Sequence, residues 1–173
     1  ASLLPRCTSL THLNLSHNLL GSSETASTLP ALPTSLQNLN MCHNQLGDAD
    51  VISLLAVMRK STNLERLNIS CNQISQAGLA NFATFLPLCT HIQDLVCTGN
   101  LTQPDLVFVE YITSTIPHLR SNTLDLQDCA LGDRGMDYLA NHVFAAHLTS
   151  LNLSANEISS QSSIKLIQFL TTS

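Results

Sequence analysis

The stretch LTHLNLSHNLL, residues 10–20, decides the fold, because its pattern returns five more times along the 173-residue chain. Each copy follows the frame LxxLxLxxNxL, and successive copies begin 26 to 29 residues apart. A period of this length is typical of repeat architectures, in which a unit buries its apolar face by stacking on its neighbours. The further copies are LQNLNMCHNQL (36–46), LERLNISCNQI (64–74), IQDLVCTGNLT (92–102), SNTLDLQDCAL (121–131) and LTSLNLSANEI (148–158).

The fourth and sixth positions of every unit are apolar, and the positions beside them are mostly polar. Alternation with a period of two predicts a short strand with one buried face. We therefore expect six parallel strands in one sheet, centred on Leu13, Leu39, Leu67, Leu95, Leu124 and Leu151.

A segment with helical spacing follows most of the strands. Mostly apolar residues recur 15, 18, 19 and 22 positions after the start of four units, which is the stripe of an amphipathic helix. The fourth unit fits this spacing when it is shifted by one residue, and Pro30 and Pro33 predict a short or irregular helix in the first. The four stripes are Val51/Leu54/Leu55/Met58, Leu79/Phe82/Ala83/Leu86, Met136/Leu139/Ala140/Val143 and Ser163/Leu166/Ile167/Leu170, and the shifted one is Phe108/Tyr111/Ile112/Thr115.

With these units, the chain resembles the leucine-rich repeat family, and its period resembles the long-repeat subclass of ribonuclease inhibitor. The resemblance implies an α/β fold: a right-handed solenoid in the form of an arc, with parallel strands on the concave face and helices on the convex face. It covers residues 1–173 as one array of six repeats. We expect this array to be a fragment of a longer solenoid or of a multidomain protein.

The ninth position of the frame is asparagine in five units and cysteine in one. The chain turns there, which leaves backbone groups without strand partners, and an asparagine side chain both donates and accepts hydrogen bonds. The resemblance implies a structural role, the asparagine ladder of the family, in which cysteine is an accepted substitute. These ladder residues are Asn18, Asn44, Asn72, Asn100, Cys129 and Asn156.

The outward positions of the strands form the predicted concave face, which is the candidate surface for a protein partner. Their character is neutral and polar, and it becomes acidic at Asp94, Asp125 and Asp128. Arg66 is the one residue here of a type that dominates protein interfaces. The asparagines of the fifth position are open to a second reading, as hydrogen-bonding neighbours on adjacent strands. The candidate surface comprises His12, Asn14, Asn38, Asn40, Arg66, Asn68, Asp94, Thr98, Asp125, Gln127 and Asn152.

Other kinds of function find little support in the sequence. A net charge of −5 argues against nucleic acid, and no apolar run reaches the roughly 20 residues that span a bilayer. His17, His43 and Cys71 share the eighth position, but neighbours in such a column lie about 5 Å apart and rarely converge on one metal ion. Motifs of catalysis and phosphate binding are missing. We therefore predict no enzyme activity, no metal and no cofactor.

The cysteines predict a reducing compartment. Six are scattered along the chain without a CxxC pair. Acceptor patterns for glycosylation begin at Asn14, Asn68, Asn100 and Asn152, where a glycan would block the predicted face or break the ladder. We expect a cytoplasmic protein, or an effector delivered into a host cell.

The sequence thus predicts a non-catalytic scaffold that binds a protein partner. The alternative is that the array is the targeting or sensing arm of a larger enzyme, ubiquitin-ligase adaptor, innate-immune receptor or bacterial effector.

Overall fold

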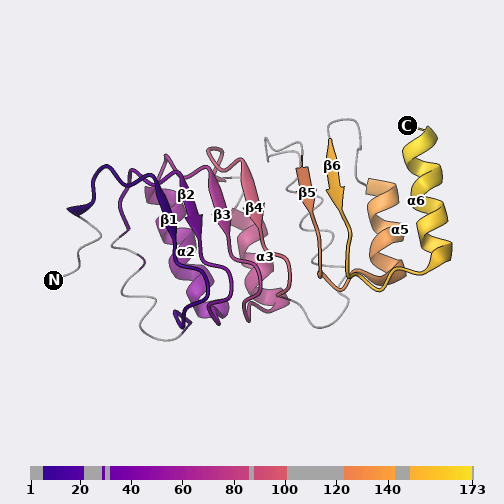
Figure 1. Ribbon diagram of the computed structural model, residues 1–173, viewed down its shortest axis with the longest axis horizontal. Helices are drawn as coiled ribbons and strands as arrows, with labels where there is room; N and C mark the ends of the chain where they lie inside the picture. The colour runs from indigo at the N-terminus through magenta and orange to yellow at the C-terminus, as the bar shows by residue number, and fades with distance from the viewer. Residues whose placement is uncertain are drawn as a thin grey trace.

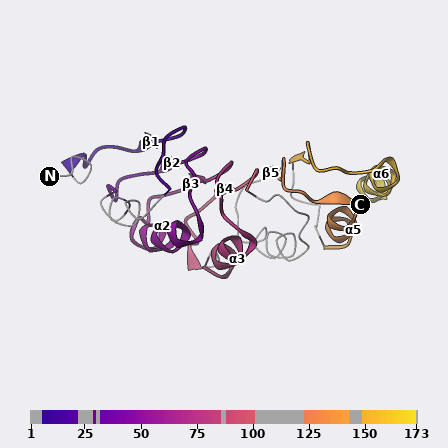
Figure 2. The same cartoon turned by 90° about the horizontal axis from the view of Figure 1, so that it is seen from below.

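The chain is seen in a computed structural model that describes residues 6–21, 29, 32–85, 88–100, 123–142 and 149–172. Short strands lie along one side of the molecule and helices along the other (Figures 1 and 2). The strands are β1 (His12–Asn14), β2 (Asn38–Asn40), β3 (Arg66–Asn68), β4 (Asp94–Val96), β5 (Thr123–Asp125) and β6 (Ser150–Asn152). The helices are α2 (Asp48–Lys60), α3 (Gln76–Phe85), α5 (Gly132–His142) and α6 (Ser160–Thr172).

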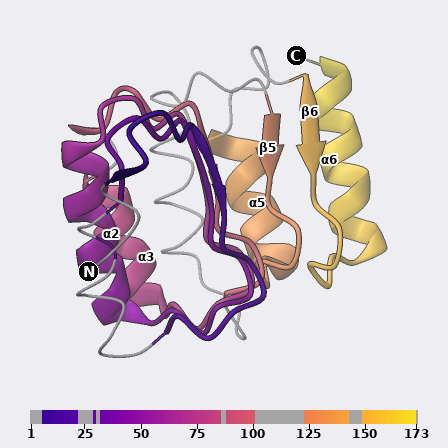
Figure 3. The ribbon, with the colours of Figure 1, turned by 60° about the vertical axis from the view of Figure 1, so that its left-hand side comes forward.

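All pairings between these strands are parallel, and they join equivalent positions of the frame. Leu39 lies between Leu13 and Leu67, for example, and Leu124 pairs with Leu151. Seen along the molecule, the first turns of the chain superpose as one coil (Figure 3). The predicted strand centres and their register are therefore confirmed.

The expectation of one continuous sheet is wrong. β1 to β4 form a four-stranded sheet and β5 with β6 a two-stranded one, and we call the boundary between β4 and β5 the seam. Among the described residues, the backbone hydrogen bond across the seam lies beyond the strand ends, from Gly99 N–H to Asp128 C=O at 2.9 Å. Gly99 has φ +65, and a Cβ there would lie 2.9 Å from Cys71 Sγ, so a larger residue would have to displace that side chain.

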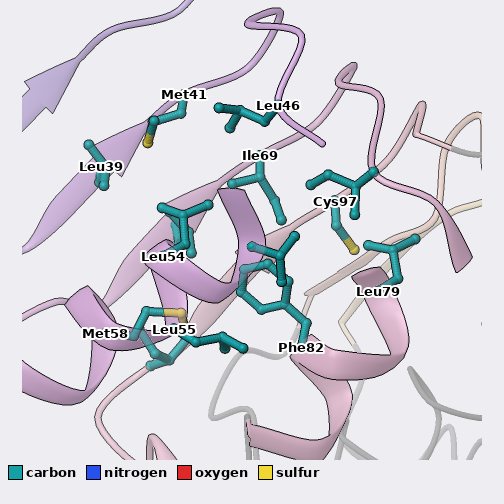
Figure 4. Close-up of a cluster of buried hydrophobic side chains, with 14 of the residues drawn as sticks. Leu39, Met41, Leu46, Leu54, Leu55, Met58, Ile69, Leu79, Phe82 and Cys97 are labelled. Atoms are coloured by element: carbon teal, nitrogen blue, oxygen red, sulfur yellow. The ribbon is translucent and has the colours of Figure 1, made fainter. Parts of the chain in front are cut away.

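The helices bury the predicted stripes against the strands. Val51, Leu54 and Met58 of α2 are fully buried, and Phe82 of α3 packs beside Ile69 in the same core (Figure 4). The last helix departs from the prediction, because Ile167 is 61% exposed while Ser162 is buried. Ile167 lies on a side of α6 that no described residue covers. The predicted helices of the first and fourth units fall largely on residues 22–28 and 101–122, outside the described residues.

The residues just before α3 and α6 are hydrogen-bonded to an aspartate side chain of the preceding unit. Asp48, in the first turn of α2, accepts hydrogen bonds from the N–H and hydroxyl of Ser75 at 2.8 and 2.6 Å, just before α3 begins. Asp133 of α5 accepts the N–H of Ser159 at 2.8 Å in the same way, before α6. These bonds lower the pKa of Asp133, chiefly through the Ser159 N–H and then through the hydroxyl groups of Ser159 and Ser162.

Candidate functional site

Seven of the predicted surface residues line one hollow of about 420 Å³ on the outward side of β1 to β4. They come from the third and fifth positions of the frame, which point away from the core because side chains alternate along a strand. We call this surface the strand face. Its lining residues are His12, Leu13, Asn14, Asn38, Leu39, Asn40, Arg66, Leu67, Asn68, Asp94 and Val96.

The fifth-position asparagines are fixed by bonds to the turn that follows their own strand. The Oδ1 atom of Asn14 accepts the N–H of Ser16 at 2.9 Å, and that of Asn40 accepts the N–H of Cys42 at 3.1 Å. Asn68 Oδ1 accepts the N–H of the residue two positions later at 2.9 Å and its hydroxyl at 2.6 Å. The Nδ2 groups of these three asparagines have no recorded acceptor among the described residues. The reading as hydrogen-bonding neighbours on adjacent strands is thus unsupported here, and the three NH2 groups remain available.

The third position carries the charged side chains of the strand face. Arg66 pairs in register with Asp94 on the next strand, so opposite charges lie on neighbouring positions. No ion pair joins them: within the described ranges, the recorded salt bridge is Lys165 with Asp137 at 2.9 Å, far away on the helices. Arg66 is exposed and Asp94 is half-buried, so both charges can meet a ligand.

Four predicted surface residues lie outside the hollow. Thr98 is only 9% exposed, because it lies where the chain turns inward after β4. We therefore no longer count it among the candidate surface residues. Asp125 and Gln127 are exposed at and beyond β5. Asn152 on β6 donates its NH2 to Gln127 Oε1 at 3.1 Å, unlike the three asparagines of the strand face.

The turn after each strand forms a rim beside the strand face. All six residues at the eighth position adopt left-handed backbone angles, with φ between 52 and 65. On this rim the rings of His17 and His43 stack with centroids 4.4 Å apart and an angle of 12° between their planes. No group of three or more His, Cys, Asp or Glu that could hold a metal ion occurs in the part of the chain that the structure describes.

The ninth-position side chains bridge consecutive units behind the rim. Asn72 Oδ1 accepts the N–H groups of Asn44 and Leu46 in the unit before it, at 2.8 and 3.0 Å. Its Nδ2 donates to the Met41 carbonyl of that unit at 3.1 Å and to two carbonyls of its own unit. Asn44, Asn100 and Asn156 repeat this arrangement with their own neighbours. Each amide therefore satisfies backbone groups of two units at once.

The ladder is interrupted at the seam. Cys129 offers no amide oxygen to Asn100, whose N–H has no recorded acceptor among the described residues. The Sγ atom of Cys129 instead lies 3.5 Å from the Gln127 carbonyl of its own turn. At the first unit, Asn18 donates only to its own turn and is exposed. The two ladder positions that differ from the pattern are thus the first unit and the seam.

The six cysteines are all free thiols in the structure. Burial raises the pKa of Cys97 to about 12, with a smaller contribution from Asp125. Burial also raises the pKa of Cys129 strongly, and the nearby Cys97 adds to the effect. These two thiols lie on opposite sides of the seam.

A second hollow of about 390 Å³ lies on the helical side between α2 and α3. We call it the outer groove. It is more apolar than the strand face and carries one cation, Arg59. Its lining residues are Ile52, Leu55, Ala56, Arg59, Asn81 and Phe85.

Three features of this region were not predicted from the sequence. The left-handed rim has one signal in the sequence, Gly99, because glycine adopts a positive φ without steric cost. The bonds of Asp48 and Asp133 to the serine before the next helix also have a signal in the sequence: an aspartate stands at the same position of two units, and a serine stands at an equivalent position of each following unit. The stacked histidines have none beyond their shared position.

Comparison with known proteins agrees with this geometry. A family model described as Leucine Rich repeats (2 copies) matches residues 34–81, and a second, Leucine Rich repeat, matches residues 6–23, 117–140 and 145–162. Both models describe repeats. No curated protein is similar enough in sequence to count as a match.

Two of the solved structures that share the fold illustrate the likeness to the chain. The tropomodulin C-terminal domain of Caenorhabditis elegans is 14% identical with a TM-score of 0.53, over 98% of this chain and 87% of that one. An internalin of Listeria monocytogenes is 22% identical with a TM-score of 0.53, over 94% of this chain and 47% of that one. At these identities the likeness concerns the fold alone. None of the described helices is long and apolar enough to cross a membrane.

Proposed function

We propose that this chain, which belongs to the leucine-rich repeat family, is a non-catalytic scaffold that binds a protein partner on the strand face. One observation carries the proposal: side chains from four successive strands converge on one hollow, where the NH2 groups of Asn14, Asn40 and Asn68 have no recorded acceptor among the described residues. A surface of this kind offers many directional contacts without a closed pocket for chemistry.

The charged residues of the face give the binding its expected hot spots. Arg66 is the residue type most enriched at such spots, and the neighbouring Asp94 complements it. Asp125 extends the charged surface past the seam. We expect Arg66→Ala to weaken partner binding at least tenfold, and Asp94→Ala and Asp125→Ala to weaken it less.

A photo-crosslinking amino acid tests the face directly. It is placed at Asn38 on the strand face or at Ala56 in the outer groove, in otherwise identical proteins, and irradiated with the protein's native cell extract. We expect a specific protein adduct from Asn38 and none from Ala56, and the adduct identifies the partner for the affinity measurements above. An adduct formed from Ala56 alone, with affinity unaffected by the three substitutions, would place the function in the outer groove instead.

We assign the chain to the long-repeat subclass as part of this proposal. The helices after β2, β3, β5 and β6 have 13, 10, 11 and 13 residues, which supports units longer than those whose second half is a short turn. We also propose that residues 1–173 are one array within a longer protein, whose other domains would make it a targeting or sensing arm. The larger size of the internalin, of which the chain covers 47%, supports this.

We place the protein inside the cell, in a reducing compartment. The free thiols support this, as does Asn100, which begins a glycosylation pattern although its side chain is buried and bonded to three carbonyls. A glycan at that nitrogen would remove the ladder bonds. Mass determination of the natural protein provides the test: an unmodified Asn100 and six free thiols are expected, and a glycan or a disulfide contradicts the location.

A further inference from the structure

We propose that the strand face, together with the exposed carboxylates just beyond the seam, holds an extended polypeptide segment of divided charge, with its carboxylates and carbonyl oxygens over β1 to β3 and its basic side chains over β4 and β5. This inference rests on the proposed function, because it names the kind of partner that the same face takes.

The donor half of the face is built from the three asparagines at Asn14, Asn40 and Asn68. Each Oδ1 atom is held by a backbone N–H at 2.9 to 3.1 Å, so turning the amide around would break that bond. The NH2 group of each residue is therefore fixed outward. Because the three strands pair in register, the NH2 groups form a row with a spacing of about 4.8 Å.

A row of fixed donors selects a ligand that brings free acceptors. The carbonyls of a helix are already bonded within the helix, whereas those of an extended segment are open. Arg66, which is exposed beside the row, adds a guanidinium group that pairs with carboxylates in a bidentate way. The part of the face on β1 to β3 presents donors and a positive charge, and it therefore favours an acidic, extended segment.

The other half of the face has the opposite character. Asp94 closes the hollow on β4, where Val96 replaces the asparagine of the donor row. Asp125 and Asp128 are exposed just beyond it, and the bond from Gly99 N–H to Asp128 C=O at 2.9 Å ties their turn to the fourth unit. No cation is paired with these three carboxylates among the described residues. Lysine or arginine side chains of a ligand are the groups that would neutralise them.

The divided charge excludes simpler ligands. A wholly basic segment would bring no carboxylates to the donor row and would place its cations against Arg66, while a wholly acidic one would meet three carboxylates. Unpaired or repelling groups at an interface cost more than a matched pair contributes, so the divided segment should bind best.

Four synthetic peptides of equal length test the charge pattern. Two join an acidic half to a basic half, one in each order, the third is acidic throughout, and the fourth is basic throughout. Fluorescence anisotropy gives the affinities for the wild-type chain. We expect one order of the divided peptide to bind at least tenfold more tightly than either uniform peptide. Equal binding of all the peptides, no binding of any, or tightest binding of a uniform one overturns the inference.

The substitution Asn40→Asp tests the donor row. It keeps the oxygen that accepts the Cys42 N–H and replaces the outward NH2 group with an acceptor, so the turn is preserved while the donor is lost. The matched control is Gln161→Glu, an equally conservative change that adds the same charge at an exposed position of α6. We expect Asn40→Asp to weaken binding of the divided peptide at least tenfold and the control less than twofold. The loss should persist at high salt, where a mere charge effect is screened.

The results separate this inference from the proposed function. Binding that depends on Arg66 and Asp125 but is unchanged in Asn40→Asp refutes the donor row and leaves the strand face as the site. The side-chain NH2 signals of Asn14, Asn40 and Asn68 in a ¹⁵N correlation spectrum give an independent readout, and they should shift when the divided peptide is added. Shifts confined to α2 and α3 would overturn both proposals.

Discussion

The sheet of β1 to β4 and the pair of β5 and β6 are built from the same frame, but the ladder that joins successive units is interrupted between them. In the first region, Asn44, Asn72 and Asn100 each bond the backbone of the unit before them. At the seam, Cys129 takes the place of the amide, and strand pairing stops at the same step. We infer that buried leucines set the register of a unit, whereas the amide ladder makes successive units continuous.

The largest predicted effect is the difference in the rate of thiol modification between the seam and the surface. The pKa of Cys97 is raised to about 12 by burial, so at pH 8 its thiolate fraction is about 1000-fold below that of an ordinary cysteine. We expect iodoacetamide to modify the exposed Cys7 at least about 1000-fold faster than Cys97 or Cys129, as measured by mass spectrometry after short pulses. Fast, simultaneous modification of Cys97 and Cys129 in the folded protein would mean that the seam opens readily.

The next effect concerns the interior of the intact ladder. Asn72→Ala removes five side-chain hydrogen bonds and leaves buried backbone groups unpaired, so it should lower the free energy of unfolding by about 3 kcal/mol. Asn68→Ala, on the strand face, loses only the bonds to Ser70 and should cost about 1 kcal/mol. Urea unfolding compares the two variants, and equal losses would contradict the distinction between the ladder and the face.

Repair of the seam should have a smaller effect of the opposite sign. Cys129→Asn supplies an oxygen for the Asn100 N–H and a donor for the Cys97 carbonyl, and it should raise the free energy of unfolding by about 1 kcal/mol. Cys129→Ala, which leaves a small cavity without adding an amide, should lower it. A Cys129→Asn variant no more stable than the wild type would show that the seam has another cause, such as the longer fourth unit.

The smallest effect lies at the helix starts of the second region. The pKa of Asp133 is lowered below its ordinary value of 3.8, chiefly by the Ser159 N–H. Its contribution to stability is therefore present above about pH 4 and is lost as the pH falls through the lowered pKa. Asp133→Asn keeps the hydrogen bond without the charge, so unfolding midpoints measured between about pH 5 and pH 2 should depend less on pH than in the wild type. An unchanged pH dependence would contradict this role.

The sequence was sufficient to predict the positions and the register of the strands, because a buried face with a period of two allows only one register. Leu39 and Leu67 fall at the strand centres as predicted and are 2% and 1% exposed. The α2 stripe was equally clear. Thr98 and Ile167 were misplaced because their environments depend on neighbouring units: Thr98 is covered where the chain turns inward, and Ile167 lies on an uncovered side of the last helix.

The candidate site was only partly predictable. The positions of Arg66 and Asp94 follow from the frame, but the fixed orientation of Asn40 depends on which atom accepts the Cys42 N–H, and the frame does not encode that choice. The seam was visible as the single cysteine at Cys129. Its consequence for strand pairing was not, because the resemblance to the family implies that cysteine is accepted at this position, and the missing bond to Asn100 is visible only in the structure.

The direction of the ladder bonds has a consequence for synthesis on the ribosome. Asn72 completes the turn of the unit that precedes it, so that unit stays open until 28 more residues have emerged, from Asn44 to its partner. At about 5–20 residues per second, each unit waits a few seconds for its successor. On the nascent chain, each turn is therefore completed only when the next unit has left the ribosome. At Cys129 the emerging unit brings no side-chain amide, so the turn at Asn100 is not completed in this way.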